Sequence, residues 1–159
     1  MAEPLSRESI VAATRRLIQS EGLDAVSLRR IAATLGVTAP ALYAYVEDKQ
    51  DLLRAVAESQ FERLIAELER IDEPDPIARI RRFSRVYVEH ALANPELFRT
   101  MFLFPPELSV ADATGNELPA ATKAFETAYQ AAAEAVERGL LRRDDPLMVA
   151  LTLWTGVHG

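Results

Sequence analysis

The sequence predicts an all-α protein. Apolar residues recur every three or four positions along most segments of the chain, as they do on one face of a helix. Serine, threonine, aspartate or asparagine precedes these segments and glycine follows several of them, which is typical of helix ends. No segment alternates polar and apolar residues as a strand does, and no Asn-Gly or Asp-Gly pair indicates a hairpin. We expect one helical domain at residues 1–50 and a second at residues 51–159.

The first fifty residues predict three helices. The first begins near Ser6 and ends at Gly22. The second begins at Ser27 and ends at Gly36, where a positive φ lets the chain turn sharply. Thr38 is placed to cap a third, short helix. The residues expected to face inward on these helices are Ile10, Ala13, Leu17, Ile18, Leu28, Ile31, Ala32, Leu35, Leu42 and Val46.

Five further helices are expected in residues 51–159 and just before them. The longest runs from about Asp48 to Leu68, with apolar residues at helical spacing along it. Residues 107–117 are expected to form a loop, and Gly139 is expected to end the helix that follows this loop. The other helices are expected to open at cap-and-proline pairs or at a proline, namely Asp75-Pro76, Asn94-Pro95, Pro119 and Asp145-Pro146.

The last helix is unusually apolar for a helix at a chain end. It has no charged residue after Asp145, and no further amphipathic helix follows it in the sequence. An apolar face of this kind is usually covered by another subunit or by more chain. We therefore expect a homodimer interface, further chain beyond Gly159, or both.

The composition is that of an ordinary soluble globular protein. Of its 159 residues, 49% are hydrophobic and 26% are charged. It lacks an apolar run long enough to cross a bilayer, and no signal-peptide core follows its first charges. It contains no cysteine, which excludes disulfides, thiolate metal sites and cysteine nucleophiles. We expect a cytoplasmic protein with no membrane partner, no metal and no cofactor.

The segment from Ser27 to Lys49 has the features of a helix-turn-helix. Ala32 is small where two helices must approach closely, and Gly36 follows where the chain must turn. Pro40, Ala41, Tyr43 and Ala44 are expected to face outward, and small residues beside a tyrosine suit entry into a DNA major groove. On the Ala32-to-Gly36 spacing alone, a plain corner between two helices of a bundle is an equal alternative.

The neighbouring residues favour DNA binding, because their order resembles the N-terminal domain of the TetR family of regulators. The sequence departs from that family at Tyr45, where histidine is common, and at Val46, where phenylalanine is common. The resemblance covers roughly the first 55 residues and lies in Gly22, Ser27-Leu28-Arg29-Arg30-Ile31-Ala32, Leu35-Gly36-Val37, Ala41-Leu42-Tyr43-Ala44-Tyr45-Val46, Lys49, Leu52 and Leu53.

The resemblance implies a nucleoid-associated transcriptional regulator, by family default a repressor released from its operator by a small-molecule effector. Its partners would be double-stranded DNA with a palindrome-like operator, a second copy of itself and that effector. Ser27, Tyr43, Tyr45 and Lys49 would bind phosphates, Arg29 a phosphate or a guanine edge, and Thr38, Ala39, Pro40 and Ala41 base edges. Tyr43 and Tyr45 could instead be packing residues and Lys49 a solvated lysine, whereas Arg30 is expected to belong to a solvated face.

The same resemblance implies an effector pocket in the C-terminal helices. Trp154, His158 and Gly159 resemble the signature of a TetR subgroup named for its Trp, His and Gly, and Trp154 and His158 share a helix face by spacing. Most aromatic residues at helical spacing are simply core, so a minority of the candidates is expected to touch a ligand. The candidates are Phe83, Tyr87, His90, Phe98, Met101, Phe102, Phe125, Tyr129, Met148, Trp154 and His158.

Charge and chemistry leave one alternative function open. The net charge is −6, and residues 1–50 hold six basic and six acidic groups, so the whole excess of acid lies in residues 51–159. A helical dimerisation or interaction module without DNA binding therefore stays possible. The sequence offers no Gly-rich phosphate loop and no histidine-glutamate metal motif, so we expect no enzyme. Arg79, Arg81, Arg82 and Arg85 could hold an anionic effector, but pairing with nearby acids is the expected state.

Overall fold

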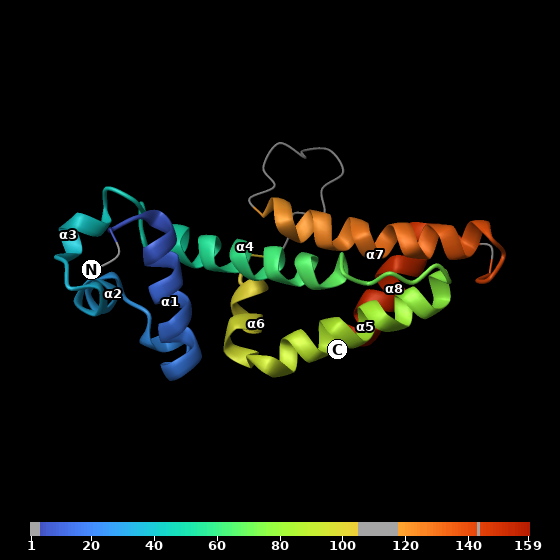
Figure 1. Ribbon diagram of the computed structural model, residues 1–159, viewed down its shortest axis with the longest axis horizontal. Coiled ribbons are helices and arrows are strands. Elements are labelled where there is room, and N and C mark those ends of the chain that lie inside the picture. The colour runs from blue at the N-terminus through green and yellow to red at the C-terminus, as the bar shows by residue number, and fades with distance from the viewer. Residues whose placement is uncertain (1–3, 105–117, 143) are drawn as a thin grey trace. The chain divides into compact units, whose positions relative to one another are not determined.

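The computed structural model describes residues 4–104, 118–142 and 144–159, and every regular element in these residues is helical (Figure 1). The elements are α1 (Arg7–Glu21), η1 (Leu23–Ala25, a short 3₁₀ helix), α2 (Leu28–Leu35), α3 (Ala39–Leu42), α4 (Lys49–Leu68), α5 (Pro76–Ala93), α6 (Pro95–Met101), α7 (Pro119–Glu137) and α8 (Pro146–His158). The all-α prediction is confirmed for the described residues. The loop expected at residues 107–117 lies outside them.

Residue contacts divide the described chain into two compact units. The first contains residues 4–60, 94–104 and Leu118, and the second contains residues 61–93, 119–142 and 144–159. Helix α4 contributes its first part to one unit and its last part to the other, and α6 folds with the N-terminal helices. A functional boundary at residue 50 stays a prediction.

Helix ends in the first unit follow the sequence closely. Ser6 caps α1 in a reciprocal capping box, in which the Ser9 amide donates to the Ser6 hydroxyl at 3.1 Å. The Ser27 hydroxyl accepts from the Arg30 amide at 3.2 Å, and Gly36 ends α2 in the left-handed region at φ 69°. Thr38 stands at the cap position of α3, but its side chain makes no capping bond there.

Helix α3 is shorter than the spacing of its apolar residues suggests. It ends at Leu42, and residues 43–45 form a turn whose Tyr45 and Val46 amides both donate to the Leu42 carbonyl. Leu42 is 0% exposed and Val46 is 2% exposed, so both face inward as predicted, although Val46 does so from beyond the helix.

The first unit has one hydrophobic core. Helices α1, α2, α3 and α4 supply most of it, and α6 adds Leu97. Partly buried residues such as Leu28, Leu35 and Val37 pack against this core. The buried members are Ile10, Ala13, Leu17, Ile18, Val26, Ile31, Ala32, Leu42, Val46, Leu52, Leu53, Val56 and Leu97.

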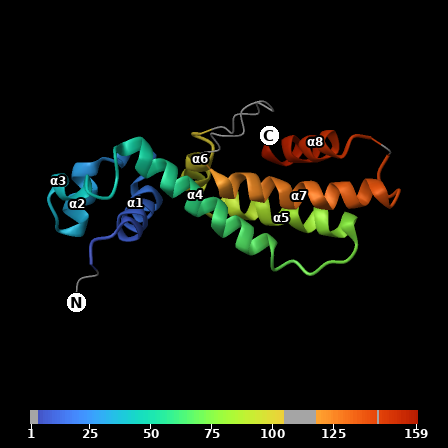
Figure 2. The same cartoon turned by 90° about the horizontal axis from the view of Figure 1, so that it is seen from above.

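The second unit packs α7 against both α5 and α8 (Figure 2). Helix α7 buries small side chains, namely Ala120, Ala124, Ala131, Ala132 and Ala135. Caps again define the helix starts, because Asp75 accepts from the Ala78 amide at 2.9 Å and Asp145 accepts from the Leu147 amide at 2.9 Å.

Helix α8 exposes much of its apolar surface within this unit. Leu147, Met148 and Leu153 are exposed, and Ala150 is the buried residue of the helix. In the single chain, the apolar side of this helix is therefore not covered, as the sequence predicts. Across the described ranges, no helix combines the length and apolar character that a bilayer crossing needs.

Candidate nucleic-acid interface and aromatic cluster

The outer surface of the helix-turn-helix carries the residues expected to meet DNA. Tyr43 is 59% exposed and Tyr45 is 39% exposed, directly beside the buried Leu42 and Val46. Thr38, Pro40 and Ala44 are exposed, and Ala39 and Ala41 are half-buried. The face therefore carries small, uncharged side chains around the two tyrosine phenols. A side chain that reaches a base edge or a phosphate needs this kind of access.

The other predicted phosphate-binding candidates, one hydroxyl and two cations, lie at helix starts. Ser27, Arg29 and Lys49 are all exposed. Because the Ser27 hydroxyl oxygen already accepts from the Arg30 amide, its proton is available for a phosphate oxygen. Arg30 pairs with Glu21, which agrees with its prediction as part of a solvated face.

One ion pair near these residues is not predicted from any spacing pattern in the sequence. Arg7, at the start of α1, forms a two-pronged pair with Asp51 in the first turn of α4, at 2.6 Å and 3.0 Å. The same guanidinium donates to the Tyr45 carbonyl at 2.7 Å. The partners lie 44 positions apart in the sequence, which places this pair beyond any local spacing rule.

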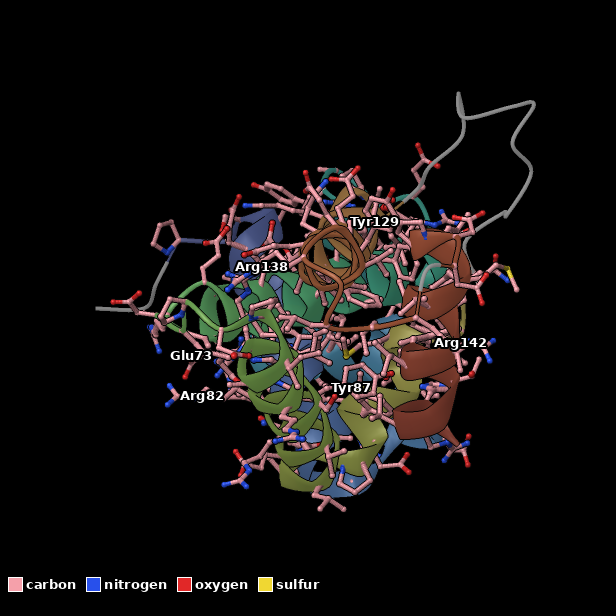
Figure 3. All side chains as sticks on the ribbon, turned by 90° about the vertical axis from the view of Figure 1, so that its right-hand side faces the viewer. Glu73, Arg82, Tyr87, Tyr129, Arg138 and Arg142 are labelled. Atoms are coloured by element: carbon pink, nitrogen blue, oxygen red, sulfur yellow. The ribbon has the colours of Figure 1, made fainter. Side chains whose placement is uncertain are left out.

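Three of the predicted effector residues meet in the second unit. The Tyr87 hydroxyl lies 2.6 Å from Nδ1 of His158, and the Trp154 ring stacks on the His158 ring with centroids 5.0 Å apart and planes inclined by 23°. Burial raises the pKa of Tyr87 to about 12, while a hydrogen bond with Trp154 acts in the opposite direction. Figure 3 shows Tyr87 within the bundle of this unit.

The other effector candidates are distributed over both units. Phe98 and Phe102 form a ring pair with centroids 5.0 Å apart in the first unit, where Met101 is fully buried. In the second unit, Phe83 is buried and Phe125 and Tyr129 are half-buried, while Met148 is exposed. His90 lies 3.5 Å from a carboxylate oxygen of Glu67.

Two of the four arginines of α5 form ion pairs. Arg79 pairs with Glu134 of α7, and Arg82 lies 3.4 Å from Glu73. Figure 3 labels Arg82 and Glu73, which lie near each other. Arg79 and Glu134 also border an open hollow between α5 and α7 that is lined by Phe83, Thr127 and Gln130. In the part of the chain that the structure describes, no cluster of histidine and carboxylate side chains could hold a metal ion.

Two family models match the chain. Residues 10–56 match the N-terminal model of bacterial regulatory proteins of the tetR family, and residues 80–159 match a tetracyclin repressor-like C-terminal domain. The second match alone covers half of the chain. The chain belongs to the TetR family.

Individual relatives of this TetR-family chain agree with that assignment. It is 27% identical to the HTH-type transcriptional regulator Rv0681 of Mycobacterium tuberculosis, over 98% of this chain and 68% of that protein. Over 53 residues it is 40% identical to the tetracycline repressor protein class D of Escherichia coli, which is 33% of this chain and 24% of the repressor. A solved protein of unknown function from Rhodococcus sp. RHA1 is 29% identical and superposes with a TM-score of 0.82, covering 99% of this chain and 81% of that one.

These relatives establish a transcriptional regulator at the level of the family, and those with a functional name are regulators rather than enzymes. The chain spans about a quarter of the class D repressor, and the match to that repressor covers 53 residues.

Proposed function

We propose that this TetR-family chain binds double-stranded DNA through α2, α3 and the turn that follows α3. The observation that carries the proposal is the exposure of Tyr43 and Tyr45 beside a fully buried Leu42 and Val46. Exposed tyrosines beside small residues add little to the stability of the unbound protein. In a complex with DNA, the major groove admits small side chains, and phosphate oxygens accept hydrogen bonds from phenols.

The proposed contacts divide into two classes. Ser27, Tyr43, Tyr45 and Lys49 bind phosphates and set the orientation of the protein on the duplex, with Arg29 reaching a phosphate or a guanine edge. Residues 38–41 lie against base edges and supply specificity. The proposed site of action is the nucleoid in the cytoplasm, with repression as the family default.

The direct test is selection of bound sequences from random duplex DNA. The parent protein should enrich a palindrome-like site, and a Tyr43→Ala, Lys49→Ala double variant should not. A Lys123→Ala variant is the matched control, because it removes an exposed lysine, paired with Glu69, from the second unit. No enrichment by the parent at low salt would favour the alternative, a helical interaction module without DNA binding.

The palindrome-like site follows from a proposed homodimer. The exposed Leu147, Met148 and Leu153 make α8 the apolar surface that a second copy would cover. Two recognition helices would then reach successive major grooves, about 34–36 Å apart. A Leu153→Glu variant should sediment as a monomer, and Leu92→Glu, at an exposed position of α5, should leave the dimer intact. Equal sedimentation of both variants with the parent would contradict this interface.

The effector site that we propose is the cluster of Tyr87, Trp154 and His158. These residues supply a polar hydrogen-bonding group and a stacked aromatic surface within one unit, and they include the Trp and His of the subgroup signature. An effector would act by favouring a conformation in which the two recognition helices no longer match the DNA.

The single tryptophan of the chain makes this site directly observable. In a screen of small organic metabolites, an effector should change Trp154 fluorescence and release the selected operator at the same concentration. Tyr87→Phe should weaken both responses equally. A metabolite that releases DNA without changing the fluorescence would place the effector site elsewhere.

A further inference from the structure

The guanidinium of Arg7 binds both the turn between α3 and α4 and the first turn of α4. Arg7 donates through Nη1 to the Tyr45 carbonyl at 2.7 Å and to Asp51 Oδ2 at 3.0 Å, and through Nη2 to Asp51 Oδ1 at 2.6 Å. A planar guanidinium can satisfy a carboxylate with two parallel bonds and still direct a third donor at a carbonyl, which an ammonium group cannot do with the same geometry.

The Asp51 carboxylate binds the same turn directly as well. Its Oδ2 also accepts from the Glu47 backbone amide at 2.9 Å, while the Asp51 amide donates to the Asp48 carboxylate at 2.8 Å. This extends the usual capping arrangement, because the acid in the first turn reaches a residue before the cap. The hydrogen bond from Arg7 holds the pKa of Asp51 below its ordinary value, so the carboxylate is charged at neutral pH.

The residues proposed to bind phosphate lie within a few positions of these two bonds in the sequence. Arg7 fixes the carbonyl of Tyr45 and Asp51 fixes the amide of Glu47, so the backbone on both sides of Val46 is bound. Lys49 begins the helix that carries Asp51. Phosphate contacts from several side chains require these side chains to keep their relative positions, because a rigid constellation loses less conformational freedom on binding.

We propose that Arg7 and Asp51 are positioning residues for DNA binding, which hold Tyr43, Tyr45 and Lys49 in one phosphate-binding arrangement without touching DNA themselves. The inference rests on the proposed DNA-binding function. It assigns a role to two residues that lie outside the recognition surface and to an ion pair that joins α1 to α4.

Simple electrostatics makes the opposite prediction for Asp51. Removing a carboxylate next to a surface that meets a polyanion should strengthen binding, because it lowers the repulsion of phosphates. Removing the positioning bonds should weaken it. The sign of the change in affinity therefore separates the two effects. Removal of Arg7 would not separate them, since both effects would then act in the same direction.

The experiment uses the full chain and a duplex selected by the parent protein from random DNA. Asp51→Asn keeps the size of the side chain but removes its charge and turns an NH₂ group toward a donor. Glu47→Gln is the matched control, since it removes one negative charge from the same turn, whereas the bond to Asp51 uses the backbone amide of Glu47. Arg7→Lys keeps the positive charge and loses the fork.

Affinity is measured over a range of salt concentrations, with circular dichroism to confirm that each variant is folded. We expect Asp51→Asn and Arg7→Lys to bind at least about tenfold more weakly, with a salt dependence whose slope is shallower by about one unit for each phosphate that the variant no longer binds. Glu47→Gln should bind as well as the parent or more tightly. A weaker affinity due only to a smaller folded fraction would leave the slope unchanged.

The outcomes distinguish the proposals. Asp51→Asn binding as tightly as Glu47→Gln would overturn the positioning role while leaving DNA binding by this chain intact. If Asp51→Asn does not fold, Arg7→Lys decides by the same two criteria, affinity and slope. If the parent binds no duplex at low salt, the proposed function fails and the positioning role fails with it.

Discussion

The two units of the molecule bury different kinds of side chain where their helices meet. In the first unit, α1, α2, α3, α4 and α6 surround a core made largely of aliphatic side chains, and a left-handed glycine turns α2 into α3. In the second unit, α5 and α8 pack against α7, which buries alanine side chains. Helix α8 leaves leucine and methionine side chains exposed. The described part of the first unit forms its core within one chain, whereas α8 of the second unit leaves apolar side chains exposed.

This difference teaches how each unit serves its function. A unit whose positions are fixed by caps, a turn and a full core can display a fixed set of side chains to DNA. A unit with small buried side chains and an apolar helix that is partly exposed can change its packing at moderate energetic cost, which the proposed effector response and dimerisation require.

The largest test of the comparison is a matched pair of leucine truncations. Leu42→Ala removes a fully buried side chain from the first unit and should reduce the free energy of unfolding by roughly 3 kcal/mol, including the cavity that it leaves. Leu153→Ala, 37% exposed on α8, should reduce it by less than about 1 kcal/mol in a single chain.

Urea denaturation at several protein concentrations measures both variants. The Leu153→Ala effect should grow with concentration if α8 is the dimer surface, because the packing that is removed then belongs to the assembly. The Leu42→Ala effect should not. Equal destabilisation by both variants at low concentration would mean that α8 is covered within the chain and that the proposed contrast between the units is wrong.

A pair of glycines gives the next largest effect. Gly36 and Gly139 both have φ 69°, and a Cβ added at either would meet no atom within 4 Å. Replacement by alanine should therefore cost about 1 kcal/mol of stability at each site, from the left-handed backbone alone. Only Gly36→Ala should also weaken operator binding, since Gly36 sets the turn between α2 and α3. A similar reduction of DNA affinity in Gly139→Ala would show that the turn is not special.

The starts of three helices in the first unit can be predicted from the sequence. Ser6, Ser27 and Asn94 each cap the helix that is expected after them, because a cap depends on the neighbouring three or four amides. The same locality explains the limit. Helical spacing places Val46 inward, but it does not show that α3 ends at Leu42 and that a turn carries Val46 instead.

Contacts between distant residues are harder to predict. The Arg7–Asp51 pair joins helices that are separated by the whole helix-turn-helix, and no spacing rule links them. Among the effector candidates, the shared helix face of Trp154 and His158 is confirmed, since it is local, but Tyr87 joins them from another helix. Met101 is fully buried in the first unit, which aromatic or sulfur content alone does not reveal.

A smaller effect is expected from removing one cap in each unit. Ser27→Ala removes the bond to the Arg30 amide and Asp145→Ala removes the bond to the Leu147 amide, and each should cost about 1 kcal/mol or less of stability. Thermal unfolding should give similar shifts for both. Ser27→Ala should in addition weaken DNA binding, because one hydroxyl no longer donates to a phosphate, and the same DNA affinity in both variants would remove Ser27 from the interface.

The smallest effect is confined to alkaline solution and concerns Tyr87. Its pKa is raised from 10.0 to about 12, so the folded state favours the protonated phenol more strongly than the unfolded chain does. The stabilisation is fully present below about pH 10 and disappears as the pH rises toward about 12. Ultraviolet absorbance should show one phenol that ionises last and is missing in Tyr87→Phe, whereas Tyr129→Phe serves as the control from the same unit. If the phenol that ionises last is still seen in Tyr87→Phe, that phenol is not Tyr87. The cluster of Tyr87, His158 and Trp154 would then be too open to select an effector.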